Sequence, residues 1–98
     1  MATLPQEEID RALAGDLSAW HQSGDAITRD VRAPSFLAGI GIVQRVAEAA
    51  EEMDHHPDVD IRYTTLTFTL STHSEGGLTA KDLELAGRID VLATDAPG

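Results

Sequence analysis

The fold is indicated by one extended stretch, DVDIRYTTLTFTLS at residues 58–71. Apolar and polar side chains alternate along it, but the parity changes near Thr64 and Thr65. The apolar positions are Val59, Ile61 and Tyr63, and then Leu66, Phe68 and Leu70. Because side chains in a strand alternate between the two faces of a sheet, the change predicts either a bulge or a break into two strands.

A long helix is predicted before this stretch, from Ser35 to Met53. Ser35 is a suitable N-cap, and the apolar residues behind it have helical spacing. The expected buried stripe is Phe36, Ile40, Val43, Ala47 and Ala50. Gly39 and Gly41 would weaken the helix by up to about 1 kcal/mol each relative to alanine, which suggests that another backbone packs closely there. The helix should end before His55-His56-Pro57, since a residue that precedes proline avoids helical geometry.

Two shorter elements are predicted nearer the N-terminus. A helix is expected over residues 5–14, with Thr3 as its cap and Gln6 completing a capping box. A hairpin is expected over residues 18–31, with its turn at residues 22–25. Trp20 lies in the first expected strand, where burial in the core is the favoured interpretation.

A third helix is predicted after the turn-forming pair Gly76-Gly77. Thr79 is its expected N-cap, Asp82 occupies the third helical position, and Leu78 can pack on Leu83. The expected buried stripe is Leu83, Ala86, Ile89 and either Leu92 or Ala93. Residues 94–98 are expected to form a frayed tail. The order α-β-β-α-β(β)-α predicts an α+β domain with an antiparallel sheet and helices on one face.

The composition predicts one small domain over residues 1–98 and excludes several classes of protein. Seventeen acidic and seven basic side chains give a formal charge of −10, which disfavours binding to nucleic acid or to an anionic membrane surface. There is no cysteine, so disulfides and thiolate metal sites are excluded. No secretory signal is recognised, and no apolar run approaches the roughly 20 residues of a membrane span. A soluble, cytoplasmic protein is therefore expected.

Three of the four histidines could carry acid–base chemistry. His55 and His56 are adjacent at the helix-to-strand junction, and His73 follows the extended stretch. Imidazole gains and loses protons near neutral pH, and carboxylates such as Glu51 and Asp82 could orient it. Such a cluster suits general acid–base catalysis on a small molecule.

Each of these residues also has a structural interpretation. Adjacent histidines at a helix end can be polar loop residues, Asp82 can be only a cap, and Glu51 can belong to a solvated helix face. His21 is interpreted as an exposed strand residue. Zinc binding is not expected, because neighbours in extended chain point apart and the spacings His-x3-His and His-x-His are absent.

The spacing of these residues resembles the signature of the pterin-4a-carbinolamine dehydratase family. The pattern is Glu51, three residues, His55-His56-Pro57, five residues, Tyr63, nine residues, His73, eight residues and Asp82. Flanking matches are Trp20, Ala26-Ile27-x-Arg29, Val46-Ala47, Leu70-Ser71-Thr72, Gly77-Leu78-Thr79 and Leu85-Ala86. The resemblance extends over residues 4–93.

The resemblance implies a fold and an activity. The family has a four-stranded antiparallel sheet with three helices on one face, in the order α-β-β-α-β-β-α, and its members form homodimers or homotetramers. They are hydro-lyases that dehydrate 4a-hydroxytetrahydropterin to quinonoid dihydropterin in the recycling of tetrahydrobiopterin. The resemblance implies no metal and no organic cofactor.

The resemblance also implies residue roles. His55 and His73 would exchange protons with the substrate, while Asp82 would position His73. His56 would bind and orient the pterin, and Glu51 would contact its ring. The implied catalytic set is His55, His56, His73 and Asp82. The implied substrate contacts are Glu51, Asp54, Pro57, Ser71 and Thr72.

The chain departs from the family pattern at a few positions, and two alternatives stay open. Val59 replaces a frequent aromatic residue, Val31 and Ala33 replace phenylalanines, and Pro34 precedes the long helix. One alternative is a non-catalytic protein-binding or assembly factor of the same fold, and the other is an enzyme for a different small molecule. The intact histidine and aspartate set favours an enzyme, because a scaffold has no need of it.

Overall fold

The computed structural model describes residues 2–94, which adopt an α+β fold. The elements in chain order are α1 (Gln6–Ala14), β1 (His21–Ser23), β2 (Ala26–Arg32), α2 (Phe36–Met53), β3 (Asp58–Arg62), β4 (Thr65–Leu70), the 3₁₀ turn η1 (His73–Glu75) and α3 (Ala80–Thr94). This order confirms the predicted fold class. Thr94, which was expected to begin a frayed tail, is instead the last residue of α3, and the rest of that tail lies outside the described residues.

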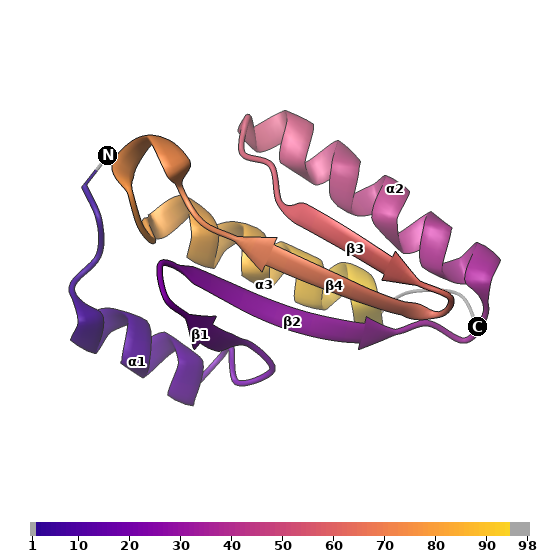
Figure 1. Ribbon diagram of the computed structural model, residues 1–98, viewed down its shortest axis with the longest axis horizontal. Coiled ribbons are helices and arrows are strands. Elements are labelled where there is room, and N and C mark those ends of the chain that lie inside the picture. The colour runs from indigo at the N-terminus through magenta and orange to yellow at the C-terminus, as the bar shows by residue number, and fades with distance from the viewer. Residues whose placement is uncertain (1, 95–98) are drawn as a thin grey trace.

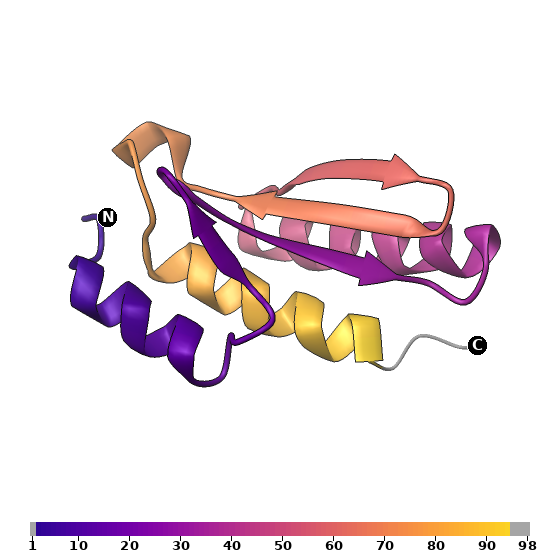
Figure 2. The same ribbon diagram turned by 60° about the horizontal axis from the view of Figure 1, so that its bottom comes forward.

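The four strands form one antiparallel sheet in the order β1-β2-β4-β3. The three helices lie on one face of this sheet, as Figures 1 and 2 show. β2 and β4 are the central strands, whereas β1 and β3 are the edges. The opposite face carries polar side chains, including Thr28 and Thr69, whose Oγ1 atoms lie 3.3 Å apart.

The parity change near Thr64 is a break between two strands rather than a bulge. Arg62 pairs with Thr65, so only Tyr63 and Thr64 form the turn. Tyr63 has a φ of 54° and a side chain that is 78% exposed. The expectation that Tyr63 continues the strand alternation is therefore wrong, because the chain has already turned there.

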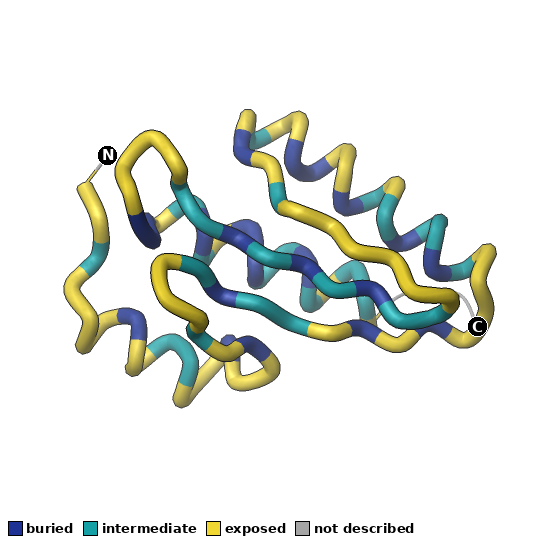
Figure 3. Tube along the Cα trace, viewed as in Figure 1, coloured by how far each residue is buried: buried dark blue, intermediate teal, exposed yellow. Residues whose placement is uncertain are grey.

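Pairing of β3 with β4 directs their apolar side chains to the same face of the sheet. Val59 lies opposite Phe68, and Ile61 lies opposite Leu66. Phe68 and Leu66 are fully buried, whereas Val59 and Ile61 are 38% and 39% exposed. The difference arises because β3 is an edge strand, which Figure 3 shows exposed along its length.

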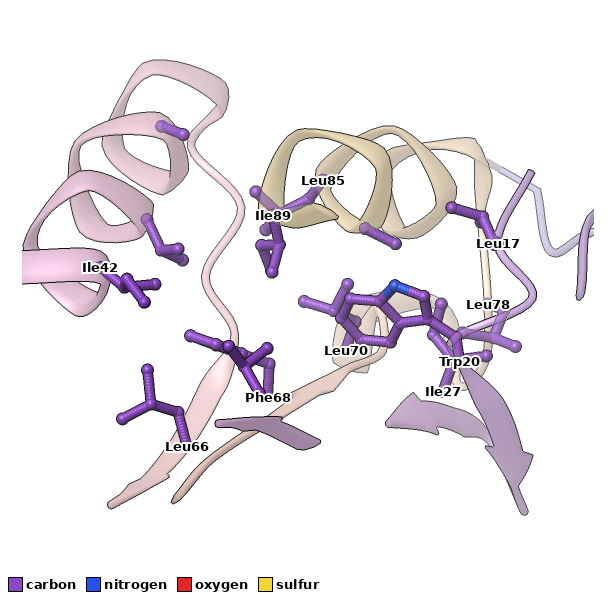
Figure 4. Close-up of a cluster of buried hydrophobic side chains, with 14 of the residues drawn as sticks. Leu17, Trp20, Ile27, Ile42, Leu66, Phe68, Leu70, Leu78, Leu85 and Ile89 are labelled. Carbon is purple, nitrogen blue, oxygen red and sulfur yellow. The ribbon is translucent and has the colours of Figure 1, made fainter. Parts of the chain in front are cut away.

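The N-terminal hairpin is shorter than predicted. β1 begins at His21, and the turn is Gly24-Asp25, with Gly24 at a φ of 60° that glycine adopts without strain. Trp20 lies just before β1 rather than in it. Its ring is buried in the core near Leu70, as Figure 4 shows, which confirms the packing interpretation.

α2 has the predicted ends but buries a different face. Ser35 caps it by accepting a hydrogen bond from the Ala38 N–H at 3.1 Å, and Met53 is its last residue. The predicted stripe is wrong except at Ala50, since Phe36 is 51% exposed and Val43 is only partly buried. The residues of α2 that are buried are Gly39, Ile42, Val46, Ala49 and Ala50.

The start of α1 differs from expectation. Pro5 rather than Thr3 is the N-cap residue, and no side chain makes a capping hydrogen bond. Gln6 does not complete a capping box, because its amide bonds to Asp10 and to Gln22 instead. Gln6 thereby ties α1 to the N-terminal hairpin.

α3 begins where predicted, directly after Thr79. The Asp82 carboxylate accepts a hydrogen bond from the Thr79 N–H at 2.9 Å, which is half of the predicted capping box. The buried residues of α3 are Asp82, Leu85, Ala86 and Ile89, whereas Leu83 is only partly buried. Asp82 thus occupies a core position of the helix that packs beneath the sheet.

Candidate active site

The C-terminal end of α2 and the turn η1 lie at the same end of the molecule, as both ribbon views show. The chain leaves α2 through Asp54, which has left-handed φ and ψ of 51° and 44° and whose N–H bonds to the Ala50 and Glu51 carbonyls. The His55 N–H also returns to the Ala50 carbonyl, at 3.0 Å. This tight turn places His55 in the interior and leaves His56 exposed.

His55 forms a buried pair with Asp82 of α3. Its Nε2 lies 2.6 Å from Asp82 Oδ1, and the two side chains are 9% and 0% exposed. The other carboxylate oxygen, Oδ2, accepts hydrogen bonds from Thr72 Oγ1 at 2.7 Å and from the Thr79 N–H at 2.9 Å. Asp82 was expected to position His73, but the imidazole that it contacts directly belongs to His55.

His56 and Glu51 form a second pair on the surface of the same helix end. His56 Nε2 contacts a Glu51 carboxylate oxygen, and both side chains are exposed. Next to this pair is a mostly apolar recess of about 210 Å³. Its lining residues are Val43, Val46, Ala47, Ala50, Glu51, His56, Pro57 and Val59. Polar groups beside an apolar surface can hold and orient a flat heterocycle.

His73 is the first residue of η1 and is exposed. Within residues 2–94 its imidazole makes no hydrogen bond. The residue before it, Thr72, is held at both ends: its N–H donates to the Gly77 carbonyl at 3.0 Å, and its hydroxyl donates to Asp82. The turn that carries His73 is thus fastened to the His55–Asp82 pair through one residue.

Comparison with known proteins identifies the family of this chain. The family model for pterin 4 alpha carbinolamine dehydratase matches residues 2–92. The chain belongs to this family. A relative in Nocardia farcinica that carries the dehydratase name is 60% identical over 92% of this chain and 94% of its own. A relative of the same name in Mycobacterium tuberculosis is 49% identical over 94% of this chain and 97% of its own.

Solved structures of dehydratase-like proteins share the fold. One from Brucella melitensis, described as a transcriptional coactivator/pterin dehydratase, is 33% identical, with a TM-score of 0.88 over 93% of this chain and 98% of its own. A pterin dehydratase-like protein described as a RuBisCO assembly factor in the alpha-carboxysome is 20% identical, with a TM-score of 0.62 over 76% of this chain and 86% of its own. The second likeness shows the fold alone.

The other residues expected to contact the pterin do not all lie beside the recess. Pro57 lines the recess beside His56, and Asp54 is an exposed helix cap. Ser71 is partly buried just after β4. Tyr63, which belongs to the family pattern but was not an expected contact, lies in the β3–β4 turn, at the opposite end of β3 from His55 and His56, as Figure 1 shows for that turn. Thr72 is partly buried, and its hydroxyl donates to Asp82.

Thr79 is the member of the site that the sequence did not reveal. It was expected only as a helix cap, but its Oγ1 lies 2.8 Å from Thr72 Oγ1, so its side chain joins the Asp82 network. The one further signal in the sequence was the flanking match Gly77-Leu78-Thr79 to the family pattern. His21 is exposed in β1, as expected.

Two larger grooves lie away from the histidines. One of about 540 Å³ runs between α2 and α3, and one of about 550 Å³ runs between α1 and α3. No histidine lines either groove, so size alone does not identify the site. Among residues 2–94, no group of three or more histidines or acids is arranged to hold a metal ion, and no helix could cross a membrane.

Proposed function

We propose that this protein dehydrates 4a-hydroxytetrahydropterin to quinonoid dihydropterin by histidine acid–base catalysis. The observation that carries the proposal is the buried His55–Asp82 pair, in a chain whose relatives carry the name of this dehydratase. A carboxylate that faces one imidazole nitrogen orients the ring and selects its tautomer. An imidazole held in this way suits proton transfer to or from a bound substrate.

The reaction requires two proton transfers and no redox step. One proton reaches the 4a-hydroxyl as the C4a–O bond breaks and water leaves. The other leaves N5, whose electron pair forms the C4a=N5 bond of the product. In this proposal His55 and His73 supply the two transfers, and His56 with Glu51 orients the ring beside the apolar recess. A positioned acid–base group contributes about 10²–10⁴-fold to such a rate.

The proposal is tested by the dehydration rate of freshly generated 4a-hydroxytetrahydropterin, followed by ultraviolet absorbance. His73→Ala removes an exposed side chain without a hydrogen bond among the described residues, so the melting temperature should not change. We expect it to lower kcat by about 10²-fold or more. His21→Ala changes another exposed histidine, in β1, and is the matched control that should keep the wild-type rate.

The opposite outcome points to the alternative function. If a folded wild-type protein does not accelerate dehydration, the proposal is wrong. A non-catalytic binding or assembly role would then fit better, because α2 presents Phe36 and Leu37 at 51% and 79% exposure. Equal rates for wild type and His73→Ala would instead remove His73 from the mechanism.

We also propose that the protein forms a homodimer through the free edge of β3. This edge strand has unpaired backbone groups along one side, and Val59 and Ile61 leave apolar surface exposed beside it. Pairing with the same strand of a second copy would satisfy the backbone and cover this surface.

A further inference from the structure

The hydrogen-bond directions around Asp82 can be assigned by counting protons. A carboxylate only accepts hydrogen bonds, so the single O–H of Thr72 must be donated to Asp82 Oδ2, at 2.7 Å. In its 2.8 Å contact with Thr79 Oγ1, Thr72 is therefore the acceptor and Thr79 the donor. The result is a directed chain from the Thr79 hydroxyl through the Thr72 hydroxyl to the carboxylate.

This chain determines which carboxylate oxygen faces the imidazole. Oδ2 already receives two donors, the Thr72 hydroxyl and the Thr79 N–H at 2.9 Å. Oδ1 is left for His55 Nε2, at 2.6 Å. With Asp82 ionised, Oδ1 only accepts, so Nε2 carries the proton and the neutral imidazole has its lone pair on Nδ1.

The Nδ1 atom of His55 is accessible. No hydrogen bond within residues 2–94 occupies it. Among the described residues, the only side-chain nitrogen or oxygen that is both buried and without a hydrogen bond is Arg45 Nη2. Since His55 Nδ1 makes no hydrogen bond and is not one of these buried atoms, it must be exposed to solvent.

We propose that Thr72, supported by the Thr79 hydroxyl, is a positioning residue that turns the Asp82 carboxylate toward His55 Nε2, so that His55 Nδ1 is the nitrogen that exchanges a proton with the substrate. The proposal rests on the proposed dehydratase function and deepens it. It also reassigns Thr72, since a hydroxyl that donates to Asp82 and accepts from Thr79 has little capacity left for a pterin. Through its backbone, Thr72 holds the turn that carries His73 as well.

The test uses Thr72→Val, which removes the hydroxyl and keeps the shape of the side chain. In the ligand-free protein, imidazole ¹⁵N NMR should show the Nε2–H tautomer of His55 in wild type and a mixture that includes Nδ1–H in the variant. We expect kcat to fall about 10- to 100-fold while KM changes less than about twofold, because geometry rather than binding is lost. Thr72→Ser should restore both readouts.

Two further variants keep the test decisive. Thr79→Val removes the outer hydroxyl and should act in the same direction with a smaller effect, and it carries the test if Thr72→Val does not fold. Thr69→Val is the matched control, since Thr69 and Thr28 form a similar hydroxyl pair on the other face of the sheet. It should leave tautomer and rate unchanged.

The outcomes separate this inference from the proposed function. A raised KM with unchanged kcat and tautomer in Thr72→Val would make Thr72 a substrate contact and overturn the inference. Unchanged kcat, KM and tautomer would overturn it too. Absence of dehydratase activity in wild type would defeat the proposed function, whereas the tautomer measurement would still decide whether Thr72 positions Asp82 and His55.

Discussion

At the scale of single residues, Asp82 joins two roles in one buried carboxylate. Its Oδ2 accepts the Thr79 N–H at the start of α3, while its Oδ1 faces His55 Nε2. A fully buried carboxylate needs such donors, because an unpaired buried charge costs several kcal/mol. The same side chain therefore contributes to the fold and to the proposed chemistry, and a useful variant must separate the two.

Asp82→Asn separates them. The asparagine oxygen can still accept from Thr72 and Thr79, but its NH₂ group then faces His55 and requires Nε2 to accept a hydrogen bond. The imidazole proton moves to Nδ1, the wrong tautomer for the proposed base. The corresponding change in a serine protease triad costs about 10⁴-fold in kcat.

For Asp82→Asn we expect kcat to fall by about 10²–10⁴-fold, while the free energy of unfolding falls by about 1 kcal/mol. Denaturant unfolding and initial rates on the same preparation measure both. A stability loss of this size with an unchanged rate would mean that Asp82 is only a helix cap. Asp90→Asn is a suitable control, since Asp90 also receives a side-chain hydrogen bond, from Trp20, outside the site.

At the scale of elements, α2 shows what periodicity can and cannot decide. Its length and its Ser35 cap were predictable, because capping and the break before Pro57 are local chemistry. Its buried face was not predictable, because apolar residues cover a broad arc of the helix. The predicted stripe and the buried stripe therefore have similar spacing along the sequence. The structure selects the stripe through Ile42 and Val46, and packing against the sheet makes that choice.

In the candidate site, too, local features were predictable from the sequence and contacts between elements were not. The sequence located its histidines at a helix end and after a strand, and it identified Asp82 as an important position. It could not assign the partner of Asp82, because the bond to His55 spans 27 residues and depends on how α2 and α3 are placed. The Thr72–Thr79 contact spans only seven residues, but it was hidden for a different reason, since hydroxyls give no periodic signal.

Helical glycines provide an element-scale prediction. A Cβ added to Gly87 in α3 would meet nothing within 4 Å, so the chain gains no packing from this glycine. Gly87→Ala should therefore raise the free energy of unfolding by up to about 1 kcal/mol. Gly24→Ala is the control: nothing lies within 4 Å of its added Cβ either, but its φ of 60° strains an alanine, so the free energy of unfolding should fall. Equal gains at both positions in urea denaturation would contradict this account.

At the scale of the whole molecule, the β3 edge is where a second copy can extend the sheet. A two-fold antiparallel pairing centred on Asp60 places Asp58 opposite the partner's Arg62 and Val59 opposite the partner's Ile61. Each dimer then gains two ion pairs and two apolar pairs, which must outweigh the repulsion between Asp60 and the partner's Asp60 at the centre of the pairing. Helices of both copies stay on the same side of the extended sheet, because residues paired across strands share a face.

This register makes a charge-reversal prediction. Wild type should elute in light-scattering chromatography at twice the mass of one chain, and Arg62→Asp should shift it toward monomer by facing Asp58 with a like charge. The double variant Asp58→Arg with Arg62→Asp should restore the dimer, because the ion pairs are re-formed with exchanged signs. Arg32→Asp, at the end of β2 and away from that edge, is the control and should stay dimeric. A dimer that survives both Arg62→Asp and Ile61→Lys would place the interface elsewhere, with the exposed Phe36 and Leu37 of α2 as the next surface to vary.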